Sequence, residues 1–209
     1  MRASCAGSAS SIILDINQNQ YLFIPDQDQS GLDLTSDFTF ETWLKLISFP
    51  VGADYSIVTK SEGAPNKSYT IRLLENSGVH SVRILTTADG STNNIADIAD
   101  IDLLQNLELD TWYHLAVVYV ALDGTGEVFL DGVSQGISAA LSNSIADTAA
   151  EFQIGAWSSN GGHFDGYIDD FRVWARAKSQ AEVLATKDQE LSGSEPDLRG
   201  YWKLNSSPA

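Results

Sequence analysis

FDGYIDDFRVW, residues 164–174, is the stretch that most directly predicts the fold of this chain. A turn glycine is followed by a strand-like run that carries two adjacent acids, Asp169 and Asp170. Side chains alternate between the two faces of a strand, so Asp169 is expected to share a face with Phe171, and Asp170 with Arg172. Asp170 then has a cationic partner, whereas Asp169 has apolar neighbours and calls for a cation such as a metal ion. The alternative is a strand end where both acids reach water.

The composition is that of an acidic globular protein. Of 209 residues, 43% are apolar and 10% aromatic, which is enough for a sizeable core. The 28 acids outnumber the 12 bases and give a formal net charge of -16. Such a charge repels nucleic acids and anionic membrane surfaces, because binding there depends on Lys and Arg. It suits cations and a salty or calcium-containing medium, or it serves solubility alone.

The beginning of the chain differs in composition from the rest. Residues 1–11 are rich in Ala, Ser and Gly and lack the apolar stretch of a signal peptide, so we interpret them as a linker. Residues 12–209 are expected to form one domain. The single cysteine, Cys5, excludes an intrachain disulfide. No apolar run approaches transmembrane length, so membrane insertion is not expected.

Short apolar runs separated by Gly, Asn and Asp predict strands along most of the chain. The predicted strands are residues 11–16, 21–24, 38–47, 55–59, 69–74, 79–86, 112–121, 127–130, 133–137, 152–157, 166–174 and 199–204. Tight turns are expected at residues 76–78 and 131–132, where Gly supplies a positive φ. Ser179 and Glu182 form a capping-box pattern that predicts one short helix. An all-β sandwich or jelly roll follows from this pattern.

Five blocks of sequence carry a resemblance to a known family. In order they are FTFETWL (38–44), TWYHLAVVY (111–119), VFLDGV (128–133), FQIG (152–155) and residues 164–174. Together they resemble the laminin-G-like and pentraxin-like domains of the concanavalin A-like lectin/glucanase superfamily. The resemblance spans roughly residues 12 to 204 and implies a jelly-roll sandwich of two antiparallel sheets with about six or seven strands each.

The resemblance also implies a context. The closing run, residues 200–204, is similar to the strand that often leads into a further copy of such a domain. We therefore expect a module tethered to other domains of a longer bacterial protein that is secreted or displayed on the cell surface. Because this fold hosts lectins, adhesion modules and glycosidases, it does not by itself indicate a function.

The motifs expected of an enzyme are missing from the sequence. The glucanases of this superfamily use a strand like Glu-x-Asp-x-x-Glu, and the nearest candidate, residues 108–112, lacks the second Glu. His80, His114 and His163 are scattered without metal-ligand spacing. We therefore expect no catalytic residues, and a glycoside hydrolase is the least favoured function.

A structural calcium ion is implied by the resemblance. In the related glucanases, a strand of the pattern apolar-Asp-x-x-Arg-x-aromatic gives its Asp to a calcium that joins the N-terminal region to that strand. Asp169 stands at the matching position, and Asp15 is the expected N-terminal partner. Asp170, next in the chain, completes the candidate set of ligands.

The loop before that strand offers a candidate binding site. Pentraxins place a calcium pair there, but residues 156–162, AWSSNGG, lack the acids. Trp157, Asn160 and His163 instead combine an indole face with amide and imidazole groups, which is the usual chemistry of a carbohydrate site. Tyr55, in another loop, is a weaker candidate for its rim. The alternative is that Trp157 packs against a neighbouring loop.

The sequence thus favours a non-catalytic, calcium-stabilised module that binds a glycan. The alternative is a structural or adhesion domain that contacts a surface protein.

Overall fold

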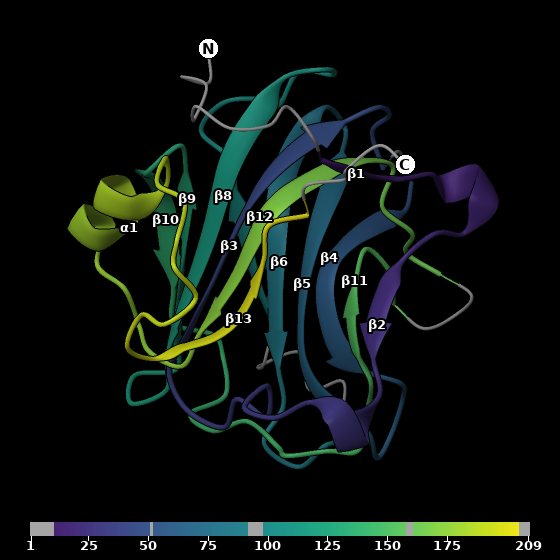
Figure 1. The fold of residues 1–209 in the computed structure, drawn as a ribbon. Coiled ribbons are helices and arrows are strands. Elements are labelled where there is room, and N and C mark those ends of the chain that lie inside the picture. The colour runs from purple at the N-terminus through teal and green to yellow at the C-terminus, as the bar shows by residue number, and fades with distance from the viewer. Residues whose placement is uncertain (1–10, 51, 92–97, 158–160, 205–209) are drawn as a thin grey trace.

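Two antiparallel sheets packed face to face make up the fold (Figure 1). The computed structural model describes residues 11–50, 52–91, 98–157 and 161–204. Sheet A has seven strands in the order β1-β12-β3-β8-β9-β10, and β13 also pairs with β12. Sheet B has six, in the order β2-β11-β4-β5-β6-β7. The predicted β-sandwich with one short helix is confirmed.

The bounds of the strands follow the predictions closely. Those of sheet A are β1 (Ile12–Leu14), β3 (Phe38–Leu46), β8 (Trp112–Val120), β9 (Thr125–Leu130), β10 (Val133–Ser138), β12 (Gly166–Trp174) and β13 (Leu198–Trp202). Those of sheet B are β2 (Leu22–Ile24), β4 (Asp54–Ser61), β5 (Lys67–Asn76), β6 (Val79–Thr86), β7 (Ile98–Asp102) and β11 (Phe152–Ile154). Two short 3-10 helices, η1 (Ile16–Gln18) and η2 (Asp26–Asp28), flank β2. Among the described strands, only β7 was not predicted, and neither were the two 3-10 helices.

Local sequence signals set the turns and the helix. Ser77 and Gly78 both have positive φ in a two-residue hairpin between β5 and β6, as expected. Asp131 and Gly132 do the same between β9 and β10. The predicted capping box, Ser179 with Glu182, begins α1 (Gln180–Thr186). None of the helices among the described residues is long and apolar enough to cross a membrane.

A β-bulge in β12 changes which side chains face the core. The register with β3 shifts between Asp169 and Arg172, and Asp170 adopts a φ of 57°. The extra residue places Ile168 and Phe171 in the core together, so Asp169 and Arg172 both face outward. The prediction that Asp169 shares a face with Phe171 is therefore wrong, because strict alternation does not survive a bulge.

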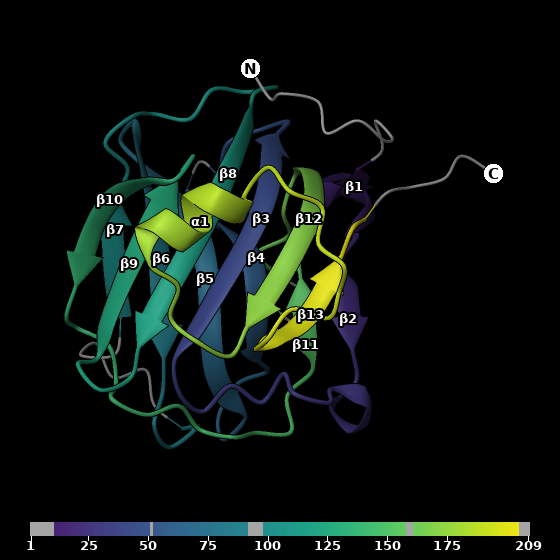
Figure 2. The same ribbon diagram turned by 60° about the vertical axis from the view of Figure 1, so that its left-hand side comes forward.

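Helix α1 covers the outer face of sheet A, in front of β9, β8 and β3 in Figure 2. A buried ion pair holds this layer together: Lys178 Nζ donates to Glu41 Oε1 at 2.6 Å. Trp43 Nε1 donates to the carbonyl of Lys187 at 3.0 Å, just after the helix. This part of sheet A is thus buried on both faces.

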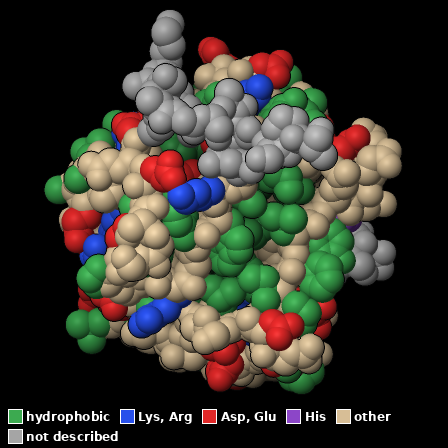
Figure 3. All heavy atoms as spheres, in the orientation of Figure 1, with side chains coloured by type: hydrophobic (Ala, Val, Ile, Leu, Met, Phe, Trp, Pro, Cys, Tyr) green, Lys and Arg blue, Asp and Glu red, His purple; other side chains and the backbone are tan. Residues whose placement is uncertain are grey.

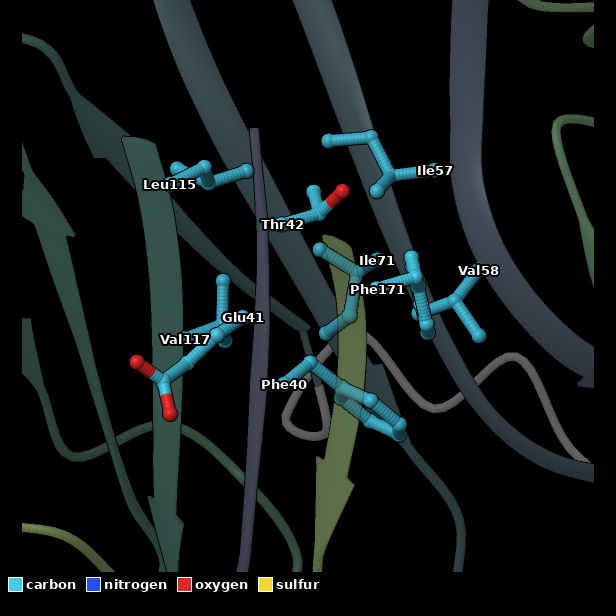
Figure 4. A pocket seen from close by; sticks show the side chains of 9 residues that line it. All are labelled: Phe40, Glu41, Thr42, Ile57, Val58, Ile71, Leu115, Val117 and Phe171. Atoms are coloured by element: carbon cyan, nitrogen blue, oxygen red, sulfur yellow. The ribbon is translucent and has the colours of Figure 1, made fainter. Parts of the chain in front are cut away.

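The space between the sheets is filled by side chains. A cavity of about 10 Å³ remains, and Figure 4 shows Ile57, Val58 and Ile71 of sheet B facing Phe40 and Phe171 of sheet A around it. That volume is about what one water molecule needs. The cavity is too small for a sugar ring.

The edge strands β13 and β2 lie on the same side of the sandwich (Figure 2). Trp202 is partly buried and stacks on Phe152 with ring centroids 5.7 Å apart. Hydrophobic side chains gather in this part of the surface in Figure 3, and acidic side chains lie mostly around it.

Candidate functional site

The loop between β11 and β12 folds back onto sheet B. Gly162 accepts a hydrogen bond from the backbone N–H of Ser56 in β4 at 2.7 Å, and Gly161 accepts one from Trp157 at 3.0 Å. Gly162 has a φ of 61°, and a Cβ there would lie 2.8 Å from Ser56 Oγ. Glycine is therefore needed for the loop to approach β4 this closely. The loop carries Trp157 to the outer face of sheet B.

Trp157 lies over a guanidinium on that face. The Cζ atom of Arg72, in β5, is 4.4 Å from the centroid of the Trp157 ring, a cation–π contact. The side chain of Trp157 remains 37% exposed. The ring is therefore held in place and still accessible to a ligand.

Arginines and aspartates alternate beside Trp157. Arg72 Nη1 donates to Asp54 Oδ2 at 3.1 Å, and Arg83 Nη1 lies 3.8 Å from the same oxygen. Arg83 also donates to both carboxylate oxygens of Asp100, at 2.7 and 2.8 Å. Opposite charges are matched along this strip, which presents hydrogen-bond donors and acceptors side by side.

Burial and ion pairing shift the pKa values of the two arginines in opposite directions. Burial lowers the pKa of Arg72, and its hydrogen bond to Asp54 partly offsets this. The hydrogen bond to Asp100 raises the pKa of Arg83. Both guanidiniums stay charged at neutral pH, because the pKa of arginine lies far above that range.

A row of polar side chains lies next to this strip. Gln153, Thr59 and Thr70 lie in register across β11, β4 and β5. Phe23 of β2 pairs with Gln153 at the edge of the sheet and is 53% exposed. Within the part of the chain that the structure describes, the buried atoms Thr59 Oγ1, Ser56 Oγ and Arg72 Nε have no hydrogen-bond partner.

The other residues predicted for a glycan site lie away from the exposed surface. His163 is 6% exposed, and its ring centroid is 6.0 Å from that of Tyr21. Tyr55 is 4% exposed and faces the core, where its hydroxyl lies 2.6 Å from Ser48 Oγ and burial raises its pKa. Tyr55 is therefore not on the rim of a binding site. Asn160 lies outside the described residues.

The predicted calcium ligands are not brought together. Ile12 pairs with Ile168 and Leu14 with Gly166, so Asp15 and Asp169 lie roughly 13 Å apart along the strands. Asp15 Oδ1 accepts a hydrogen bond from the backbone of Asn17, as the cap of η1. These two carboxylates do not fit a shared calcium ion.

Asp170 is also occupied, because its Oδ2 accepts a hydrogen bond from Arg172 Nη2 at 2.5 Å. This is the pairing expected from the sequence. Asp169 is nearly buried, on the outer face of β12. The described segments contain no group of three or more His, Cys, Asp or Glu side chains that could hold a metal ion. Calcium at Asp169 stays a prediction.

Sequence reasoning missed the arginine–aspartate strip. Its members come from β4, β5, β6 and β7, and β7 was not predicted. One signal was available: the hairpin at Ser77 and Gly78 places Arg72 directly opposite Arg83. Like charges in that position repel, so they require acidic partners nearby.

Comparison with solved structures supports the fold. A Bacteroides ovatus protein to which carbohydrate binding is attributed is 16% identical with a TM-score of 0.65, covering 95% of this chain and 51% of that one. Domain 4 of an extracellular arabinanase from Geobacillus stearothermophilus, in complex with arabinotriose, is 18% identical with a TM-score of 0.60, covering 84% and 75%. The CBM40 domain of a Ruminococcus gnavus sialidase, bound to α2,3-sialyllactose, is 15% identical with a TM-score of 0.60, covering 86% and 98%.

The chain spans only about half of the Bacteroides protein. At these identities the similarity establishes the fold alone. The ligand of each solved structure is a property of that protein. The family model described as the concanavalin A-like lectin/glucanases superfamily matches residues 17–184, which is most of the chain. The chain therefore belongs to the laminin-G-like branch of that superfamily.

Proposed function

We propose that this protein is a non-catalytic glycan-binding module and that the outer face of sheet B around Trp157 is its binding site. The observation that carries the proposal is the partly exposed Trp157 ring, held by Arg72 beside a strip of matched charges. An indole face packs against the C–H groups of a sugar, while neighbouring polar groups bind its hydroxyls.

The charge of the strip favours a neutral sugar. Asp54 and Asp100 neutralise the two arginines, so neither a cationic nor an anionic ligand gains a free opposite charge there. Sugar hydroxyls both donate and accept, and they suit alternating guanidinium and carboxylate groups. The paired state of both carboxylates also supports a binding role over catalysis, because a glycosidase needs one carboxyl group free to give up a proton.

Several solved structures with this fold are described as binding carbohydrate, which supports the same class of ligand. The affinity we expect is modest. Repetition of such modules within one longer chain would make it useful, because linked sites raise the effective concentration. Attachment to further domains and a secreted or cell-surface location are parts of the proposal.

A glycan-array screen followed by affinity electrophoresis in neutral polysaccharides tests this function. Wild type should bind at least one neutral glycan, and Trp157→Ala should lose most of that binding. Leu122→Ala, which shortens an apolar side chain exposed in the β8–β9 turn, is the matched control and should bind like wild type. A wild type that binds no glycan would leave the structural or adhesion domain as the better interpretation.

The proposal includes a structural calcium ion at Asp169 and at no other residue. Melting with calcium and with a chelator tests it, because a structural ion stabilises only the folded state. We expect the chelator to lower the melting temperature of wild type and of Asp15→Asn, but not that of Asp169→Asn. An unchanged melting temperature in wild type would remove calcium from the proposal.

A further inference from the structure

A second partly exposed row of side chains crosses the outer face of sheet A, opposite the proposed glycan site. Ile13 pairs with Tyr167, Tyr167 with Lys45, and Lys45 with Trp112, so the row runs over β1, β12, β3 and β8. Neighbouring strands lie about 4.8 Å apart, which gives the row a length of roughly 14 Å. Ile13 is 45% exposed, and the other three are partly exposed.

The row begins where the cover of sheet A ends. Lys187, just after α1, lies over the ring of Trp43 at 5.3 Å, two residues before Lys45 in β3. Along the outward-facing positions of β3, Glu41 and Trp43 are buried, whereas Lys45 is partly exposed. The next outward-facing position along β3 is therefore the first that solvent reaches.

Lys45 is held by aromatic rings instead of by an acid. Its Nζ lies 4.3 Å from the ring centroid of Tyr167 and 5.6 Å from that of Trp112. Among the described residues, no carboxylate lies within 4.0 Å of this ammonium group, whereas Arg72, Lys178 and Lys203 each have one. The protein carries 28 acids against 12 bases, yet two aromatic rings and not a described carboxylate hold this cation.

We infer that the row of Ile13, Tyr167, Lys45 and Trp112 is a second binding site, for an acidic sugar within a glycan. The ammonium of Lys45 provides a charge-assisted hydrogen bond for one carboxylate or sulfate, and the indole of Trp112 provides an apolar face for the ring that carries it. The rest of the glycan must be largely neutral, because the net charge of the protein repels a polyanion. This site is independent of the neutral-glycan site around Trp157.

A matched pair of disaccharides tests the inference. Cellobiose and cellobiouronate have the same two rings and differ at one C6, which is a hydroxymethyl group in the first and a carboxylate in the second. Binding to the intact chain is measured by calorimetry and by the NMR shift of the Trp112 indole N–H. We expect cellobiouronate to shift this signal and to bind at least about tenfold more tightly than cellobiose, which is the effect of one charge-assisted hydrogen bond.

Lys45→Met keeps the length of the side chain and removes its charge. It should weaken cellobiouronate binding at least about tenfold and leave the melting temperature close to that of wild type. Lys203→Met is the matched control, because Lys203 is an exposed lysine already paired with Glu190. It should bind like wild type.

Any of five results would overturn the inference. Two concern the ligand: equal binding of the two disaccharides, and no saturable shift of Trp112. Two concern the variants: unchanged cellobiouronate binding by Lys45→Met, and loss of that binding in Trp157→Ala alone, which would assign the acid to the site on sheet B. The last is a stable dimer in sedimentation that Trp112→Ala dissociates, because a second copy of the chain would then cover the row.

Discussion

Arg172 Nη2 donates a hydrogen bond to Asp170 Oδ2 at 2.5 Å across a β-bulge, and Asp170 itself has a φ of 57°. The carboxylate thus pairs with a guanidinium that is buried beneath the end of α1 and the segment after it, where Arg172 also donates to the carbonyls of Thr186 and Gln189. Asp170, the residue that distorts the strand, is thus also the one that neutralises the cation that the bulge turns to the outer face of the sheet.

Asp170→Val is expected to destabilise the fold by about 2–4 kcal/mol, since a β-branched residue is strained at this φ and the buried arginine loses the carboxylate among its acceptors. Asp170→Asn should cost less, because Asn tolerates a positive φ and keeps one acceptor oxygen. Urea denaturation of the three proteins measures both effects. Equal stability of wild type and Asp170→Val would contradict the role given to the bulge.

A second prediction concerns stability at mildly acidic pH. His114 packs edge-on against Trp43 and lies 3.5 Å from Glu41 Oε2, an acid that would favour the charged imidazole. Burial outweighs this acid and, together with Arg172 and the two neighbouring lysines, holds the pKa of His114 well below its usual range. The unfolded chain therefore takes up a proton below about pH 6.5 while the folded protein does not.

The contribution of His114 to the free energy of unfolding is therefore fully present above that pH. It falls as the pH decreases, by up to about 1.4 kcal/mol per pH unit. Denaturation between about pH 5 and pH 7 should show a shallower slope for His114→Phe than for wild type. Burial also lowers the pKa of His80, so some slope should persist in the variant. Identical slopes would mean that His114 takes no part in the acid response.

The third prediction uses two adjacent glycines. Gly162→Ala introduces a Cβ 2.8 Å from Ser56 Oγ at a φ of 61°, so the loop must move away from β4 and carry Trp157 with it. Glycan affinity should fall although Trp157 is unchanged. Gly161→Ala is the control, because its Cβ would meet nothing closer than 3.8 Å.

Calorimetry with a glycan selected on the array measures both variants. If Gly162→Ala binds as tightly as Gly161→Ala and wild type, the position of Trp157 does not depend on the contact between the loop and β4.

Features encoded by neighbouring residues could be predicted from the sequence. The hairpin at Ser77 and Gly78 and the helix start at Ser179 each depend on side chains within three positions of one another. The family blocks located the sheets for the same reason, since each block is one strand with its turn.

Features that depend on distant segments could not be predicted. The bulge at Asp170 is revealed by the register of β12 against β3, and it reversed the expected faces of Asp169 and Phe171. The strand β7 was missed even though Ala99 and Ile101 are buried and Asp100 and Asp102 exposed, because this alternation covers only five residues.

The candidate site also combines a feature encoded locally with features that depend on distant segments. The exposed Trp157 was predicted from its loop, whereas Arg72 under its ring comes from a strand 85 positions earlier in the chain. The strip of charges needs the cross-strand register of four strands, which no local pattern contains. Tyr55 was misplaced because its side chain, near the start of β4, points into the core and not toward the loops.

The most direct measurement is the affinity of Trp157→Ala for the neutral glycan that wild type binds best. Isothermal titration should show at least about tenfold weaker binding by Trp157→Ala than by Leu122→Ala or wild type, with the three melting temperatures alike, because truncating a central tryptophan removes much of the contact. Equal affinity of Trp157→Ala and wild type would contradict a glycan site on the outer face of sheet B.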